Sequence, residues 1–247
     1  MRKFWKKGFT LLLGTLLAVS LTGCGRSADG TGSTAGGSGT ANIVNIGVTG
    51  SLVSFNPFVM DMSEMNHYSS GLMFLPLVEL DQNLNFVPML ADSITTEDNL
   101  TFTVHIDDAA TWSDGTPVTA ADVEYTVRRL CSPVVANPYM MYYVFEGVDD
   151  ETGFVEENAD SVAGIRIVDD KTITFTVKSP MSLISFENGY ARYMNILPKH
   201  VIEKFSEAEL TTNEWFSHPD VVSGPYMVTD FDPEHYVSYI ANTNYFK

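Results

Sequence analysis

The most informative segment of the chain is TWSDGTPVTAADVEYTVRRL, which runs from Thr111 to Leu130. Ser113-Asp114-Gly115 has turn chemistry, because aspartate accepts local backbone hydrogen bonds and glycine tolerates a positive φ. Thr119, followed three residues later by Asp122, has the spacing of a helix capping box. The apolar residues beyond it recur as on one face of a helix, at Val123, Val127 and Leu130. The segment therefore predicts a tight turn followed by an amphipathic helix.

Two segments on either side of this helix predict β-hairpins. In DSITTEDNLTFTVHI (92–106) apolar and polar residues alternate about a turn at 97–99, and in GIRIVDDKTITFTV (164–177) they do so about 169–171. This alternation indicates strands with one buried and one wet face. We also expect strands at 43–48, within 76–88 and on both sides of Pro233, and short helices within 63–74 and 197–205. The mixture indicates an α/β chain, in detail a mixed α+β lobe.

The N-terminal part has the layout of an export signal. Basic residues at positions 2, 3, 6 and 7 precede an apolar run from Phe9 to Leu21, which is shorter than the roughly 20 residues that a membrane span needs. Leu21-Thr22-Gly23-Cys24 then resembles the bacterial lipobox, in which the cysteine is diacylated and becomes the mature N-terminus. We expect a lipoprotein signal peptide over 1–23, a lipidated Cys24 with a flexible linker over 24–41, and a globular part over 42–247. An ordinary signal peptide with a chance cysteine, or a signal anchor, stays open as an alternative.

The composition excludes several partners. The formal net charge is −17, and removing the four basic residues of the signal leaves −21 on the remainder. So acidic a chain is a poor match for nucleic acid and for anionic lipid, since both attract Lys and Arg. Cys131 has no partner once Cys24 is acylated, so we expect it to be a buried apolar residue.

No catalytic constellation is recognisable in the sequence. The five histidines form no HExxH or other close metal-ligand spacing, and no serine lies in a GxSxG setting. No glycine-rich loop follows a strand with phosphate-binding spacing. We therefore expect no enzyme activity, no metal site and no cofactor.

Several segments, in their order along the chain, resemble the extracellular solute-binding proteins of ABC importers, in the oligopeptide, dipeptide and nickel class known as family 5. They are SFNPF, LVELDQNLNFVPMLADSITTEDNLTFTVHI, TWSDGTPVTAADVEYTVRRL, VDDKTITFTVKSP, ILPKHVIEK and SGPYMVTDFDPEHYVSYIANTNYF. The resemblance implies a periplasmic-binding-protein-like type II fold, in which two lobes close on a ligand. Family members are much longer, so we expect the first lobe with the second lobe missing, as a truncated product or as a fragment.

The resemblance also implies where a ligand would contact the chain. In the family the loop after the first strand lies at the cleft, and so does a tyrosine of the segment matching ANPYMMYYVFEG. The substrate-binding candidates are Gly50, Ser51, Leu52, Val53, Tyr139 and Tyr142. Other motif residues are interpreted as structural, namely Trp112, Asp114, Gly115, Asp122, Gly224, Pro225 and Tyr226. Tyrosines suit peptide ligands of varied shape, although core packing explains them equally well.

The function that the resemblance implies is that of a lipid-anchored substrate-binding component of an ABC importer. It would bind oligopeptides or dipeptides at the extracytoplasmic face of the cell membrane and deliver them to permease subunits. One alternative is a truncated surface lipoprotein that no longer transports and acts as an interaction module or a remnant. A minor alternative is a binder of nickel, metal chelates or sugars.

Overall fold

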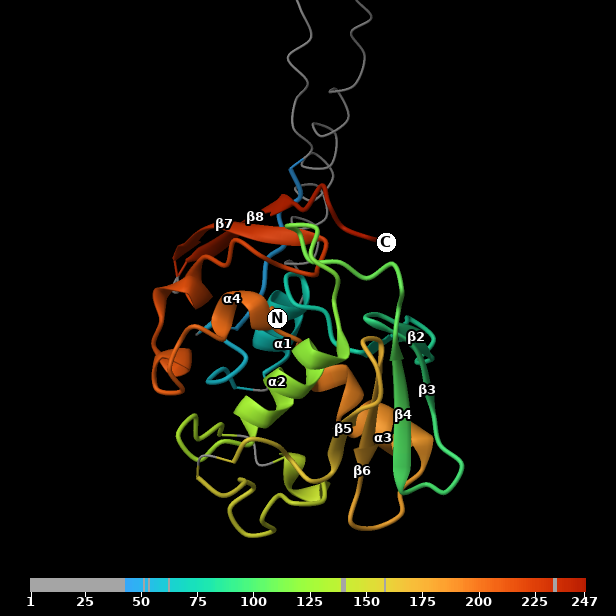
Figure 1. Ribbon diagram of the computed structural model, residues 1–247. Coiled ribbons are helices and arrows are strands. Elements are labelled where there is room, and N and C mark those ends of the chain that lie inside the picture. The colour runs from blue at the N-terminus through green and yellow to red at the C-terminus, as the bar shows by residue number, and fades with distance from the viewer. Residues whose placement is uncertain are drawn as a thin grey trace, which may run out of the picture. The chain divides into compact units, whose positions relative to one another are not determined.

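The computed structural model describes residues 43–247, except residues 51, 53, 62, 139, 140, 158, 233 and 234. The chain divides into two units, Met1–Ile46 and Gly47–Lys247. All helices and strands of the described residues belong to the second unit (Figure 1). The lipidation candidate Cys24 and the expected linker lie outside the described residues.

A four-stranded antiparallel sheet forms the centre of the second unit. Its strands are β3 (Ala91–Thr95), β4 (Thr101–Ile106), β5 (Ile165–Ile167) and β6 (Thr172–Thr176), in the order β3-β4-β6-β5. The two predicted hairpins are confirmed, and pairing of β4 with β6 joins them into one sheet. This register sets Phe102 opposite Phe175 and Val104 opposite Ile173, so the two central strands share a buried apolar face.

Two helices supply much of the apolar surface that meets this sheet. The predicted helix is confirmed as α2 (Ala120–Leu130), which packs against β5 and β6. Its capping box is also confirmed, since the backbone N–H of Thr119 donates to Asp122 Oδ2 at 2.8 Å. On α3 (Leu183–Gly189), the ring of Phe186 stacks on Phe102 with centroids 4.2 Å apart and planes 2° from parallel.

The remaining elements are short and surround this core. They are α1 (Glu64–Gly71), α4 (Lys199–Ile202), the hairpins β1 (Val78–Leu80) with β2 (Phe86–Pro88) and β7 (Tyr226–Asp232) with β8 (Tyr236–Ala241), and the 3-10 helices η1 (Met141–Val144), η2 (Ala191–Tyr193), η3 (Glu209–Thr211) and η4 (Glu214–Ser217). Both helices and both hairpins were expected from the sequence. Cys131, directly after α2, is buried and forms no disulfide, and burial raises the pKa of its thiol to about 12.

The predicted strand at 43–48 is wrong. These residues form no helix or strand, and the apolar side chains of Ile43, Val44 and Ile46 are each more than three-quarters exposed. Alternation of apolar residues produces a strand only where a neighbouring strand accepts the backbone hydrogen bonds. Across the described part of the chain, no strand pairs with this segment.

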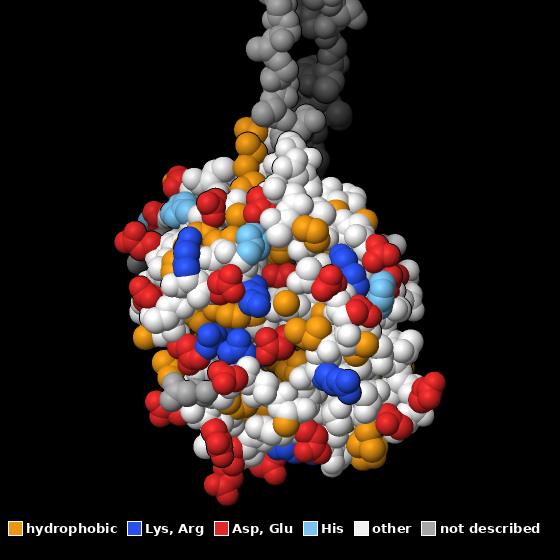
Figure 2. Space-filling view, in the orientation of Figure 1, with side chains coloured by type: hydrophobic (Ala, Val, Ile, Leu, Met, Phe, Trp, Pro, Cys, Tyr) orange, Lys and Arg blue, Asp and Glu red, His pale blue; other side chains and the backbone are white. Residues whose placement is uncertain are grey.

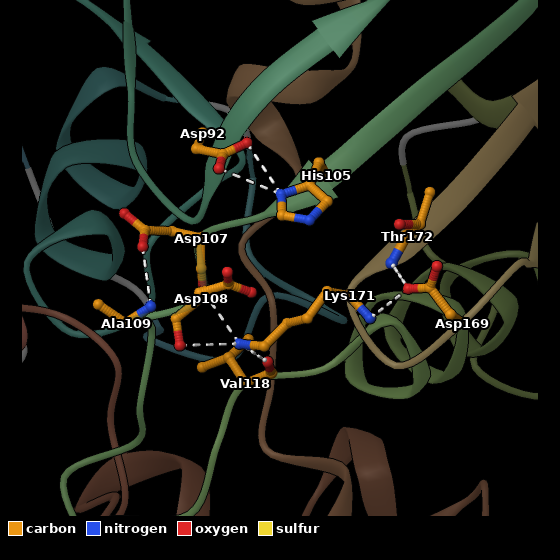
Figure 3. A network of polar contacts seen from close by, with 9 residues as sticks. All are labelled: Asp92, His105, Asp107, Asp108, Ala109, Val118, Asp169, Lys171 and Thr172. Atoms are coloured by element: carbon orange, nitrogen blue, oxygen red, sulfur yellow. Dashed lines mark hydrogen bonds and ion pairs between the residues drawn. The ribbon is translucent and has the colours of Figure 1, made fainter.

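Lys171, in the turn between β5 and β6, ties the sheet to the loop that leads into α2 (Figure 3). Its Nζ donates to the carbonyl oxygens of Val118 at 2.9 Å, Asp107 at 3.0 Å and Asp108 at 3.5 Å. The carboxylate of Asp169 accepts from the backbone N–H of Lys171 at 2.9 Å and so holds the turn in place. One ammonium therefore satisfies three carbonyl groups of a loop without regular structure.

We predict that Lys171→Met lowers the free energy of unfolding by about 1–3 kcal/mol, because it removes the charged donor and leaves the partly buried carbonyl of Val118 without its donor. Urea unfolding followed by circular dichroism measures this change. The control is Lys204→Met, whose exposed ammonium donates no hydrogen bond among the residues that the structure covers. Equal stability of the two variants would contradict the role assigned to Lys171.

Candidate ligand-binding site

The predicted loop after residue 48 lies against α1. Gly50 is exposed, and a Cβ atom at this position would lie 2.7 Å from Cγ of Met65, so a larger residue there would require the Met65 side chain to move. Leu52 is buried. Ser51 and Val53 lie outside the described residues. Of the four candidates, Gly50 therefore lies at the surface beside α1, and Leu52 contributes to the core.

Phe55 and Asn56 hold the end of this loop. Phe55 is buried against Phe231 of β7, with ring centroids 4.7 Å apart. Asn56 Oδ1 accepts from the backbone N–H of Phe58 at 3.0 Å, and Nδ2 donates to the carbonyl of Leu210 at 2.7 Å. The loop is thus anchored on both sides by buried contacts.

The second predicted segment meets the first through Asn137. Its Nδ2 donates to the carbonyl oxygens of Phe58 at 3.1 Å and Pro57 at 3.4 Å. Tyr142 is only 3% exposed and stacks near Phe145, and burial raises the pKa of its hydroxyl. Tyr139 lies outside the described residues. Tyr142 therefore packs in the interior, and its role as a ligand contact stays a prediction.

The motif residues interpreted as structural lie in turns and caps. Gly115 has a φ of +87°, and Asp114 Oδ1 accepts from the backbone N–H of Thr116 at 2.9 Å. Trp112 is fully buried, and its Nε1 donates to no acceptor among the described residues. Burial raises the pKa of Asp122, whose Oδ1 also accepts from the backbone N–H of Lys199 at 2.9 Å. Asp122 therefore joins the start of α2 to the start of α4.

Gly224 allows two backbones to touch. A Cβ atom there would lie 2.2 Å from the carbonyl oxygen of Leu72, which no side chain could tolerate. Pro225 follows, and Tyr226 begins β7, where its backbone N–H donates to the same Leu72 carbonyl at 3.1 Å. The segment thus fixes where β7 leaves the end of α1.

A polar cluster that the sequence did not reveal lies between α1, β1 and η2. Glu79 Oε2 is 3.0 Å from Nε2 of His67, and Glu79 Oε1 is 3.0 Å from Nη2 of Arg192. Glu79 Oε1 also accepts from the backbone N–H of Leu80 at 2.8 Å. His67 is 5% exposed, so the cluster lies mostly beneath the surface. Its three charged or polar side chains are far apart in the sequence and carry no motif.

A series of aromatic rings runs through this cluster towards η1. Ring centroids of His67 lie 5.4 Å from Tyr68 and 5.1 Å from Tyr193. Tyr190, in the same turn as Tyr193, lies 5.6 Å from Phe145. Burial and the nearby hydroxyl of Tyr143 raise the pKa of Tyr190.

The described residues contain no group of three or more His, Cys, Asp or Glu side chains that could hold a metal ion. None of the helices in this part of the chain is long and apolar enough to cross a membrane. The described surface beside the two anchored loops carries tyrosines and carboxylates.

A family comparison identifies the class. The model of the bacterial extracellular solute-binding proteins, family 5 Middle, matches residues 85–247. The chain belongs to the family 5 solute-binding proteins, whose members bind rather than transform their ligands. The predicted family and its periplasmic-binding-protein-like fold are confirmed.

Curated relatives match over part of their length. The periplasmic oligopeptide-binding protein OppA of Salmonella typhimurium is 28% identical over 157 residues, which cover 60% of this chain and 28% of the relative. The peptidoglycan-binding protein YepA of Agrobacterium fabrum is 29% identical over 224 residues, or 82% of this chain and 31% of the relative. The chain therefore spans about a third of the length of these relatives.

Solved structures give the same answer for the fold. Haemophilus influenzae OppA in complex with the peptide RPPGFSPFR superposes with a TM-score of 0.66 at 25% identity, covering 78% of this chain and 36% of that one. The Escherichia coli murein tripeptide-binding protein MppA superposes with a TM-score of 0.67 at 20% identity, covering 80% and 38%.

The polar cluster makes a pH-dependent prediction. Burial raises the pKa of Glu79, but hydrogen bonds from His67 and Leu80 and the charges of His67 and Arg192 lower it more, so it lies below its ordinary 4.5. A depressed pKa contributes stability that is present above the unfolded-state pKa and lost as pH falls through the folded-state pKa. Glu79→Gln should lower the free energy of unfolding at neutral pH by about 1–3 kcal/mol.

This difference from the wild type should shrink as the pH is lowered below 4.5, because the wild-type carboxylate is then protonated too. Urea titrations at a series of pH values measure it. The control is Glu97→Gln, an exposed position in the β3–β4 turn, which should change stability by less than about 0.5 kcal/mol. If Glu79→Gln lowers the free energy of unfolding by the same amount at every pH, the shape of the side chain and not its charge stabilises the cluster.

Proposed function

We propose that this chain is the ligand-binding lobe of an extracytoplasmic peptide receptor that serves an ABC importer. The observation that carries the proposal is the family match over residues 85–247, together with relatives whose names state oligopeptide or dipeptide binding. The acidic, tyrosine-bearing surface beside the two anchored loops suits peptides, whose backbone groups need polar partners and whose side chains need tolerant surfaces. The chain acts as a binder, not as an enzyme.

The predicted ligand contacts fit this function in part. Gly50 and its neighbours 51–53 would offer loop backbone to an extended peptide, and Tyr139 and Tyr142 would border it from the second segment. Tyr142 could take that role only if the packing around Phe145 changes on binding, since its ring is buried.

The proposal includes a lipid anchor at Cys24, with residues 1–23 removed as a signal peptide and residues 24–41 as the tether of a lobe over 42–247. Two acyl chains hold a protein stably at a membrane, whereas one does so only marginally. A tethered receptor stays close to permease subunits in the same membrane while it remains free to turn, because a Gly/Ser-rich linker behaves as a flexible coil. The place of action is the outer face of the cell membrane.

Peptide binding is tested on the full chain, purified in detergent, by saturation-transfer NMR with the tripeptide Ala-Ala-Ala at millimolar concentration. We expect transfer to the peptide and a weak dissociation constant, on the order of 1 mM, because a single lobe cannot enclose a ligand and exclude water. Free alanine amide is the matched small-molecule control and should show less transfer. No transfer to any tripeptide would overturn the proposed function.

Lipidation is tested by expressing the full chain in a bacterial host with labelled palmitate. Wild-type protein should incorporate the label and partition into detergent on phase separation, and Cys24→Ser should do neither, because the thioether needs the thiol. The control is Cys131→Ser, which changes the other cysteine and should keep the label. Label in the Cys24→Ser protein would contradict the anchor.

A further inference from the structure

The turn between β3 and β4 contains the tripeptide Asn99-Leu100-Thr101. An asparagine that is followed by any residue except proline, and then by serine or threonine, has the acceptor pattern of N-linked glycosylation. No other asparagine of the sequence has a serine or threonine two positions later. The pattern has this meaning only where the asparagine lies at the surface of an exported protein.

Asn99 meets the structural part of this condition. It lies in the turn of the hairpin and is exposed, and its side-chain amide makes no hydrogen bond with any of the described residues. Its backbone has a φ of +59°, a left-handed conformation that asparagine adopts more readily than most other residues. The nitrogen that would carry a sugar is therefore used by no contact within the described part of the fold.

The backbone of the turn is held without help from the Asn99 side chain. Oδ1 of Asp98 accepts from the backbone N–H groups of Leu100 at 2.9 Å and of Thr101 at 2.7 Å. Oγ1 of Thr96 accepts from the backbone N–H of Asn99 at 2.9 Å. A group attached to Nδ2 of Asn99 would thus leave the hydrogen bonds of the turn intact.

The turn also has room for a large attachment. In Figure 1 it lies at the lower right end of the central sheet, whereas β7 and β8 lie at the top. Figure 2 shows carboxylates at the same end of the molecule, and Glu97 and Asp98 are both exposed in this turn. A bulky hydrophilic group on Asn99 would therefore extend from this end into water.

We propose that Asn99 is a site of N-linked glycosylation. The sugar donor is an oligosaccharide carried on a polyprenyl diphosphate. Nδ2 of Asn99 attacks the anomeric carbon, and the new C–N bond replaces the C–O bond to the diphosphate. The lipid diphosphate leaves with the electron pair of that bond, and a base of the transferase takes one amide proton. The inference rests on the extracytoplasmic location in the proposed function, because an acceptor of this kind belongs to an exported protein.

Thr101 indicates when the transfer takes place. Its hydroxyl is part of the acceptor pattern, so the transferase has to contact residues 99 and 101 together. In the folded sheet Thr101 is half-buried and pairs with Thr176 of β6. The transferase therefore acts on the exported chain before β4 pairs with β6, and folding then leaves the sugar at an exposed position.

The test expresses the full chain in a bacterial host that supplies an oligosaccharyltransferase, its lipid-linked oligosaccharide and labelled palmitate. Wild-type protein should gain the mass of one oligosaccharide, and mass spectrometry of its peptides should place that mass on Asn99. Asn99→Asp, which tolerates the positive φ but lacks the amide, should gain none, and neither should Thr101→Val, which lacks the hydroxyl. Thr101→Ser is the matched control, because it retains the hydroxyl and should keep the added mass.

The palmitate label separates this inference from the function on which it rests. Lipidated wild-type protein without added mass, in cells whose transferase modifies a co-expressed acceptor protein, would overturn the glycosylation site and leave the receptor proposal intact. The same added mass on Asn99→Asp would overturn it too. Wild-type protein with neither lipid nor sugar would overturn the extracytoplasmic location and the glycosylation site with it. Palmitate on each variant shows that a missing sugar does not come from failed export.

Discussion

A double hydrogen bond between Ser113 and Val222 joins the turn before α2 to the segment that leads into β7. The backbone N–H of Ser113 donates to the carbonyl of Val222 at 2.8 Å, and the N–H of Val222 donates to Ser113 Oγ at 3.0 Å. Asn244 Nδ2 completes the junction by donating to the Ser113 carbonyl at 2.6 Å. Because Ser113 and Val222 are buried, losing either partner of their double hydrogen bond leaves a polar group without a replacement. The turn before α2, the strand entry at Gly224 and the segment after β8 therefore hold one another in position.

The polar cluster of His67, Glu79 and Arg192 has a similar role, because its charged contacts fix two residues that are direct neighbours of Tyr68 and Tyr193 in the chain. Glu79 contacts α1 through His67 and η2 through Arg192, so a single carboxylate joins these two elements. Rings held in this way lose little conformational freedom when a ligand arrives, which lowers the cost of binding. The packing of α1 against η2 thus depends on one charged group.

Local sequence patterns predicted the hairpins, α2 and its cap well, because each depends on neighbours in the chain. Both strands of the hairpin lie within the segment 164–177, and both partners of the cap lie within Thr119–Asp122, so each local pattern includes every residue that the structure needs. The segment 43–48 shows the limit, since its alternation is as clean but no strand among the described residues pairs with it. The cluster of His67, Glu79 and Arg192 was beyond reach for a related reason, because nothing in the local sequence of any one of them indicates the other two. Tyr142 was chosen by residue type and position, and residue type alone cannot distinguish a ring at the surface from a ring in the core.

The burial of Cys131 has a consequence for the chain's chemistry in an oxidising environment. Disulfide exchange and oxidation by peroxide both proceed through the thiolate. Burial raises the pKa of the Cys131 thiol to about 12, so the thiol stays protonated at neutral pH, and its sulfur is out of reach of solvent. In an oxidising compartment the folded lobe would therefore form neither mixed disulfides nor covalent dimers through Cys131. It gains this redox inertness from packing alone, without replacing the cysteine.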